Sequence, residues 1–207
     1  MHPYLTKLGV RPEVQEFFGN YYKPDSFGDL VFPYGTDMEH FGLAFHKVPD
    51  TNELWVAGNP NICQVRQVII GSSAMEAVAF LHFNYMAFRQ TDNLLFLSTG
   101  TKPRPGHLQW IRDNLQGKII SFVFSNDLLG RVCDLKIAAA IRALPLSVAY
   151  QNDGISVRFK LKTYHFTEEE ISLNAFEKKC GYRFLIKTYK AKKHNSYLTW
   201  LKEKFNH

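Results

Sequence analysis

Two short segments of the chain place carboxylate and hydroxyl side chains directly after buried apolar runs. Ser72-Ser73-Ala74-Met75-Glu76 follows the first run, and Ser125-Asn126-Asp127 follows the second. Carboxylates are the ligands that Mg²⁺ prefers, whereas hydroxyls beside helix starts suit a phosphate. If the protein is a metal-dependent catalyst, Glu76 and Asp127 are its candidate catalytic residues, with Asp127 as the candidate metal ligand.

A larger set of polar and basic side chains is the candidate site for an anion or a nucleic acid. Its members follow strand ends or lie in the basic tail: Ser72, Ser73, Thr99, Thr101, Lys102, Arg104, Ser125, Asn126, Lys190, Lys192 and Lys193. Helix-start N–H groups and lysines both bind phosphate oxygens. Each feature also has a structural explanation. Ser73 and Ser125 could cap helices, Glu76 and Asp127 could stabilise helix N-termini, and the lysines could form a solvated basic face.

The elements that position these residues alternate between strands and helices. Apolar runs predict strands over 65–70, 94–98, 118–124 and 146–150. Helical spacing predicts the intervening helices, over 74–88, 106–115 and 127–144. This alternation predicts a parallel sheet with right-handed crossovers, whose strand ends meet at one edge, where ligands of open α/β sheets bind.

Less regular segments flank this α/β domain, which we place at residues 61–150. Residues 1–60 are predicted to form a β-rich N-terminal lead-in, and residues 151–207 an α+β C-terminal extension packed on the domain. Alternating runs in the lead-in predict strands at 29–34, 42–46 and 53–58. In the extension, Thr167 and Glu170 have the spacing of a capping box and predict a helix start.

The composition favours a basic, cytoplasmic protein with a large core. The 207 residues carry a net charge of +6 and are 45% hydrophobic, which suits a polyanionic partner such as nucleic acid. The three cysteines are too widely separated for a zinc knuckle, and their odd number argues against a disulfide framework. We expect no membrane contact, because the chain starts without a signal pattern and no apolar run approaches roughly 18 residues.

The order and spacing of these segments resemble the Toprim domain of primases, topoisomerases, related nucleases and mobile-element proteins. Met75-Glu76-Ala77-Val78-Ala79 resembles the first Toprim motif, with Glu76 in the position of its helix acid. Phe124 to Gly130 resembles the second motif and keeps Asp127 and Gly130. Weaker likenesses to such proteins lie at Tyr4 to Val14, Leu30 to Tyr34, Leu97 to Thr101 and Lys193 to Leu198.

The chain departs from the Toprim pattern at two acids. The first motif of the family has a glutamate at the end of its strand, and this glutamate is the proposed general acid/base. In this chain the position corresponds to Ser72, or to Gly71 if the turn is one residue longer. Ser125 replaces the first aspartate of the second motif. Since a hydroxyl brings no negative charge to a Mg²⁺ ion, the resemblance implies a Toprim-like fold with a degenerate active site.

The resemblance implies a nucleic-acid-associated, primase-related protein that is catalytically weakened or inactive. Such a protein would bind DNA as an accessory to DNA mobilisation or plasmid-type replication, with a possible protein partner from that system. It would need no cofactor, or would hold Mg²⁺ only weakly. One alternative is an active Mg²⁺-dependent Toprim nuclease or primase-type enzyme that uses Glu76 and Asp127. Another is a protein–protein interaction scaffold, because a fold does not fix a function.

Overall fold

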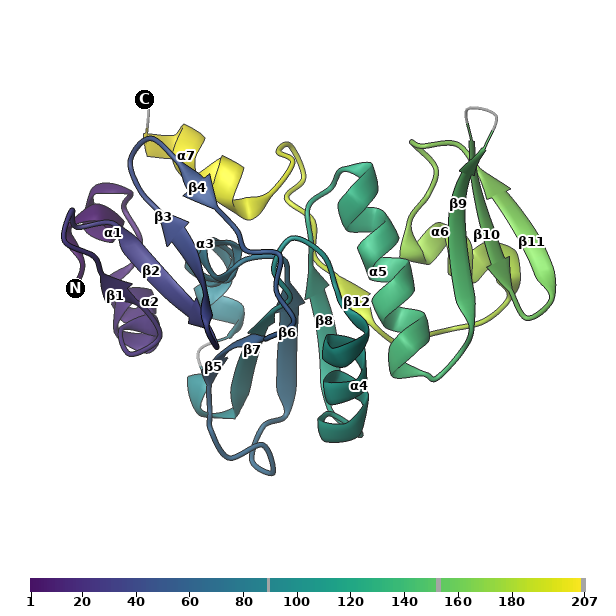
Figure 1. Ribbon diagram of the computed structural model, residues 1–207, viewed down its shortest axis with the longest axis horizontal. Coiled ribbons are helices and arrows are strands. Elements are labelled where there is room, and N and C mark those ends of the chain that lie inside the picture. Colours follow the sequence, from purple (N-terminus) through teal and green to yellow (C-terminus); the bar gives the residue numbers. More distant parts are fainter. Residues whose placement is uncertain (89, 152–153, 206–207) are drawn as a thin grey trace.

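The computed structural model describes residues 1–88, 90–151 and 154–205, which form three sheets in a row (Figure 1). An antiparallel sheet lies at the N-terminal end, a mostly parallel sheet in the centre, and a second antiparallel sheet toward the C-terminal part. Helices flank the central sheet on both faces. The predicted α/β class, with a β-rich lead-in and an α+β extension, is confirmed.

The N-terminal part begins with two short helices and continues as an antiparallel sheet. The helices are α1 (Pro3–Lys7) and α2 (Pro12–Phe18). The sheet has the order β1 (Lys23–Pro24), β2 (Leu30–Tyr34), β3 (Asp37–Phe41) and β4 (His46–Lys47). The strand predicted at 42–46 is wrong. Gly35, at φ +60°, allows a tight turn that pairs β3 with β2, and residues 42–45 form a loop with exposed Leu43 and Phe45.

The central sheet has the strand order β12-β8-β6-β7-β5. Its strands are β5 (Trp55–Gly58), β6 (Gln67–Gly71), β7 (Leu94–Ser98), β8 (Ile119–Val123) and β12 (Lys187–Thr188). The β6 strand pairs in parallel with β7 and β8, so that Ile70 lies opposite Leu97 and Phe122. The β5 strand, which we expected in the lead-in, closes one edge antiparallel to β7.

Alternate residues of the central strands face two separate cores. Ile69 and Phe96 belong to the core shared with α3 (Ala74–Asn84) and the N-terminal part. Ile70 and Leu97 belong to the core shared with α4 (Pro105–Asn114) and α5 (Leu128–Ile141). Because successive side chains of a strand point to opposite faces, continuous apolar runs are what a sheet covered on both faces requires.

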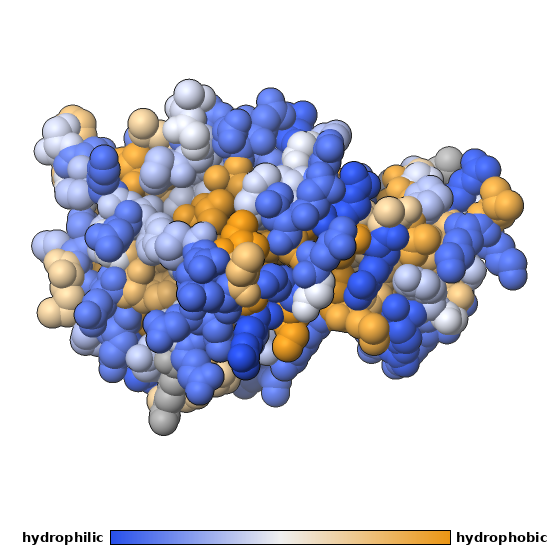
Figure 2. All heavy atoms as spheres, turned by 90° about the horizontal axis from the view of Figure 1, so that it is seen from below, coloured by the Kyte–Doolittle hydropathy of each residue, from blue (hydrophilic) through white to orange (hydrophobic). Residues whose placement is uncertain are grey.

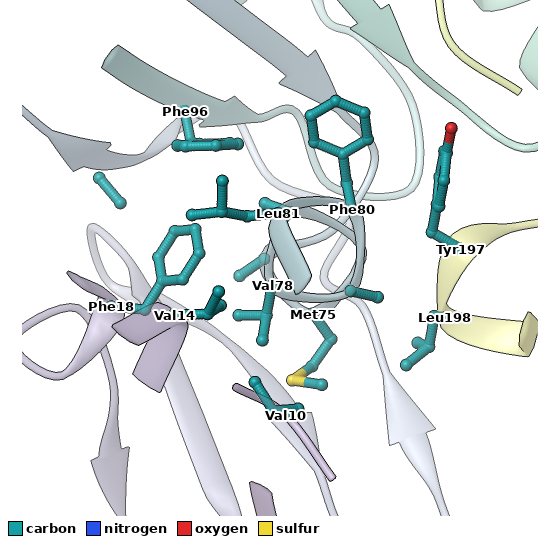
Figure 3. Close-up of a cluster of buried hydrophobic side chains, with 14 of the residues drawn as sticks. Val10, Val14, Phe18, Met75, Val78, Phe80, Leu81, Phe96, Tyr197 and Leu198 are labelled. Carbon is teal, nitrogen blue, oxygen red and sulfur yellow. The ribbon is translucent and has the colours of Figure 1, made fainter. Parts of the chain in front are cut away.

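The α3 helix is the centre of the first core. Figure 3 looks along its axis and shows side chains leaving it on all sides, with Val78 and Leu81 toward Val14 and Phe18 of α2, and Phe80 toward Tyr197. The residues from Ala74 to His82 are all buried. A helix that is apolar all round must be covered all round. Here the cover comes from the central sheet, α2 and the C-terminal helix α7 (Tyr197–Phe205).

The fourth predicted parallel strand belongs to a different sheet. Residues 146–150 lie in β9 (Leu146–Gln151), which pairs antiparallel with β10 (Gly154–Phe159), and β10 pairs with β11 (Lys162–Phe166). The β9 strand pairs with β10, its neighbour in the sequence, and not with β8, because closing a short hairpin costs little loop entropy. The free side of β8 is taken instead by β12, which is supplied by the tail.

The C-terminal sheet packs against α6 (Leu173–Cys180) through an aromatic cluster of Phe159, Phe176 and Phe184. Thr167 and Glu170 do exchange the two hydrogen bonds of a capping box. They close only a turn, however, and α6 starts later with Ser172 as its N-cap. No helix in the described ranges is both long and apolar enough to cross a membrane.

The amino ends of the parallel strands lie on the lower side of Figure 1, and Figure 2 shows the molecule from below. Hydrophilic side chains cover most of this view, and hydrophobic ones gather near its middle. A hollow of about 380 Å³ at this edge is lined by Leu115, Ile120 and Ile141, among others. Because open α/β sheets bind their ligands at the carboxyl ends of the strands, the functional site is expected at the upper edge.

Candidate functional site

A small pocket lies where β6 and β8 end, beside the start of α7 and the strand β4. It measures about 270 Å³, and we call it the strand-end pocket. Hydroxyl groups dominate its polar lining, which consists of His46, Ser72, Ser73, Glu76, Ser125, Ser196, Thr199 and Lys202. The structure thus brings together Ser72, Ser73 and Ser125 of the predicted anion site. His46, Ser196, Thr199 and Lys202 also line the pocket and were not among the predicted site residues.

A buried carboxylate occupies the N-terminus of α3, beside this pocket. Glu39 Oε2 accepts hydrogen bonds from the Ala74 N–H at 2.7 Å and the Tyr34 hydroxyl at 2.7 Å. Its Oε1 accepts from the Met75 N–H at 3.1 Å and pairs with His46 Nε2 at 2.9 Å. Ser73 is the N-cap of the helix and accepts from the Glu76 N–H. The helix end where we expected an external anion is therefore filled from within the chain.

Glu76 is likewise held by a helix N-terminus. Its carboxylate is almost wholly buried and accepts hydrogen bonds from the backbone N–H groups of Tyr197 at 2.7 Å and Leu198 at 3.0 Å. Burial raises the pKa of this carboxyl, although both hydrogen bonds oppose the rise. The candidate catalytic acid thus anchors the first turn of α7 to α3.

Asp127 caps α5, the helix that follows β8. Its Oδ1 accepts from the Gly130 N–H at 2.8 Å and from the Ser125 hydroxyl at 2.7 Å. A Cβ atom on Gly130 would collide with the Ser125 carbonyl oxygen, which explains the glycine at this position. The oxygens of Asp127 and Glu76 serve different helices, and no group of three or more metal-ligating side chains forms within the described residues. This donor set does not fit a Mg²⁺ ion.

The other predicted residues do not line the strand-end pocket. Thr99 and Thr101 continue from β7, and Thr99 is buried with its N–H on the Gly71 carbonyl. Lys102 and Arg104 both pair with Asp50, at 3.2 Å and 2.6 Å. The Asn126 N–H donates to the Asn195 carbonyl and ties the end of β8 to the tail.

The ammonium group of Lys190 makes its contacts inside the protein. It donates to the Phe124 and Ser125 carbonyls, both at 3.0 Å, and pairs with Asp134 Oδ2 at 2.7 Å. Asp134 is buried on α5, and its Oδ1 has no hydrogen-bond partner among the described atoms. Burial raises the pKa of the Asp134 carboxyl to about 6, although Lys190 opposes this rise.

A second hollow lies on the other side of the α7 start, and we call it the lysine–aromatic groove. It measures about 530 Å³ and is lined by Phe83, Asn84, Lys190, Lys192, Lys193, His194, Tyr197 and Trp200. Lys192 and Lys193 are exposed, whereas Tyr197 is buried. The Trp200 ring stacks on Phe83, with ring centroids 3.8 Å apart, and on His194, at 5.6 Å.

The sequence patterns did not indicate the site roles of Glu39, Lys202 and Trp200. Glu39 lies in a mostly polar strand beside Asp37 and His40, where a solvent-facing acid is the usual expectation, yet it is fully buried. Lys202 and Trp200 lie in a short amphipathic helix, where basic and aromatic residues are ordinary. The tail resemblance at Lys193 to Leu198 and the predicted basic residues Lys190, Lys192 and Lys193 pointed to this region.

Replacing Glu76 with glutamine tests its role as the anchor of α7. The amide keeps the shape, but its NH₂ group replaces one of the two acceptor oxygens and leaves one backbone N–H of α7 without a partner. We expect the free energy of unfolding to fall by about 2 kcal/mol in urea titrations, with faster hydrogen exchange in α7. Glu16→Gln, an exposed change on α2, should cost less than about 0.5 kcal/mol. Unchanged stability in Glu76→Gln would contradict the anchoring role.

Asp134 makes a signed prediction for the effect of pH on stability. Since its pKa is raised from 3.8 to about 6 on folding, the folded state binds more protons between these values, and stability falls as the pH rises through this interval. Its contribution is at most about 3 kcal/mol, at about 1.4 kcal/mol per pKa unit. The pKa of His82, which burial lowers from 6.5 to about 4, gives a rise in stability over the same interval, so the test is a difference between variants. In urea titrations at pH 4, 5 and 6, the stability of Asp134→Asn relative to the wild type should increase with pH. The exposed change Asp113→Asn should keep the wild-type profile.

The chain matches no family model, no curated protein and no solved structure. Its function is therefore inferred from the placement of its own side chains.

Proposed function

We propose that this protein is a Toprim-like, nucleic-acid-associated protein of the cytoplasm with little or no catalysis, accessory to DNA mobilisation or plasmid-type replication. The observation that carries the binding proposal is the lysine–aromatic groove, where two exposed lysines lie beside stacked rings. The motif order and the parallel arrangement of β6, β7 and β8 support the Toprim part. The three free thiols support a reducing compartment.

The groove offers the two contacts that a flexible strand of nucleic acid needs. Lys192 and Lys193 are exposed and suited to neutralise backbone phosphates. Phe83, His194 and Trp200 are partly exposed rings that stack on one another, so a base would extend this stack at an outer ring. This combination of charge and aromatic surface favours the binding of single-stranded nucleic acid, with little preference for the base sequence.

The weak-catalysis proposal follows from what holds the two acids. Glu76 closes the N-terminus of α7, and Asp127 closes that of α5. Serines stand at the two positions where the Toprim pattern has further acids. Phosphoryl transfer depends on metal-borne charge, which this set of donors does not gather.

A charge-reversal experiment tests the groove. The double variant Lys192→Glu with Lys193→Glu should weaken binding to a fluorescent dT₂₀ strand, measured by anisotropy in low salt. It should also flatten the slope of log affinity against log salt by about 1.4, at about 0.7 per single-strand phosphate contact. The matched control is Lys160→Glu with Lys162→Glu, which makes the same charge change in the exposed β10–β11 hairpin.

The control separates a specific groove from general basicity. If both double variants weaken binding equally, net charge alone drives the association, and the groove proposal is wrong. If the wild type binds neither dT₂₀ nor a duplex in low salt, the nucleic-acid proposal fails and the scaffold alternative is preferred.

A further inference from the structure

The strand-end pocket holds a positive charge that is not neutralised by a carboxylate. Lys202 lines this pocket from α7, and it forms no ion pair in the part of the chain that the structure describes. Its ammonium group lies 4.9 Å from the centre of the Phe41 ring. Burial lowers the pKa of Lys202, and no other group contributes to the shift. A partly desolvated ammonium of this kind gains most from an anionic ligand.

Free hydroxyl donors lie around this ammonium group. The Ser72 hydroxyl, at the end of β6, has no hydrogen bond among the residues described. Ser196 and Thr199 share one hydrogen bond of 3.2 Å. Because the Ser196 hydroxyl also interacts with the Glu76 carboxylate, Thr199 is the hydroxyl of this pair that can turn toward a ligand. The Ser125 proton is already donated to Asp127, so Ser125 contributes an edge of the pocket rather than a donor.

The carboxylates near the pocket are already paired with donors of the protein. Glu76 accepts two N–H groups of α7, and Glu39 accepts two N–H groups of α3 together with Tyr34 and His46. Asp127 accepts from Gly130 and Ser125. Their negative charges are therefore offset by helix ends, and the ammonium group remains for a ligand.

We propose that the strand-end pocket binds a terminal phosphate monoester directly and without a metal ion. Lys202 supplies the positive charge, and the hydroxyls of Ser72 and Thr199 hydrogen-bond the phosphate oxygens. A volume of about 270 Å³ is below the roughly 300–1,000 Å³ of pockets for whole drug-sized ligands. The pocket therefore takes the phosphate group and leaves the rest of the ligand outside.

The source of the phosphate rests on the proposed function. The segment from Lys192 to Thr199 lines the lysine–aromatic groove with its first residues and the strand-end pocket with its last. A strand lying in the groove can therefore present its phosphorylated end to the pocket. A free nucleoside monophosphate offers the same chemistry, and the experiment separates the two sources.

The experiment keeps EDTA present throughout and compares four probes. Calorimetry follows inorganic phosphate and a nucleoside monophosphate, and anisotropy compares dT₂₀ carrying a 5′-phosphate with dT₂₀ carrying a 5′-hydroxyl. We expect phosphate to bind in the millimolar range or tighter, and the 5′-phosphate strand to bind several-fold more tightly than the 5′-hydroxyl strand. Lys202→Met should weaken phosphate binding by about tenfold or more, as loss of a charge-assisted hydrogen bond does.

The matched variants make each outcome decisive. Methionine preserves the apolar stem over Phe41, and Lys162→Met on the distant hairpin is the control for the lost charge. If Lys202→Met fails to fold by circular dichroism, Ser72→Ala must show the same selective loss. In both pocket variants the affinity for the 5′-hydroxyl strand should be unchanged. In Lys192→Glu with Lys193→Glu, both strands should weaken and their affinity ratio should persist.

Failure of this inference differs from failure of the proposed function. Equal binding of the two strands, with no binding of inorganic phosphate, overturns the pocket and leaves the groove intact. Binding of phosphate and of the monophosphate, without binding of either strand, supports the pocket and overturns the nucleic-acid function. Phosphate binding that appears only after Mg²⁺ is added overturns the metal-free site.

Discussion

The N-terminus of α3 rests on the carboxylate of Glu39, and the joining of the N-terminal sheet to the central sheet depends on this contact. Four donors reach it: Tyr34 of β2, His46 of β4, and the N–H groups of Ala74 and Met75. A buried carboxylate without such partners costs several kcal/mol. The strands of the N-terminal sheet therefore have one register that satisfies both the carboxylate and the helix. Ser98, at the end of β7, completes this network through its contact with Tyr34.

Carboxylates accept hydrogen bonds from two further helix N-termini along this edge of the sheet, and this use of the acids limits the ligands that can bind there. Glu76 closes α7 and Asp127 closes α5, so acids that might have gathered around a metal ion are distributed among helix ends. Among the described residues that line the pocket, the Lys202 ammonium group and the Ser72 hydroxyl are left without a carboxylate or hydrogen-bond partner. Architecture and ligand chemistry thus draw on neighbouring residues of the same edge.

The sequence was most informative where the signal was local. The runs before Ser72 and Ser125 predicted adjacent parallel strands, because a strand covered on both faces is continuously apolar. The serines were therefore placed together correctly. The sequence was uninformative where the structural partner of a segment lies far away along the chain. The short segment Lys187–Thr188 gives no sign that it will displace residues 146–150 from the edge beside β8. Nor could the spacing of Lys202 and Lys204 reveal that the first faces a pocket while the second is exposed.

The anchoring of α7 by Glu76 has a consequence for the order of events during synthesis. The hydrogen bond from the Tyr197 N–H spans 121 positions of the chain. While the ribosome is still making the middle of the protein, α3 has its sheet and α2 but lacks the partner for Glu76. Domains generally fold as units from the N-terminal side during translation. In this protein, however, the upper edge of the central sheet is completed only when α7 has been made, and the nascent chain carries an exposed apolar side of α3 until that helix emerges.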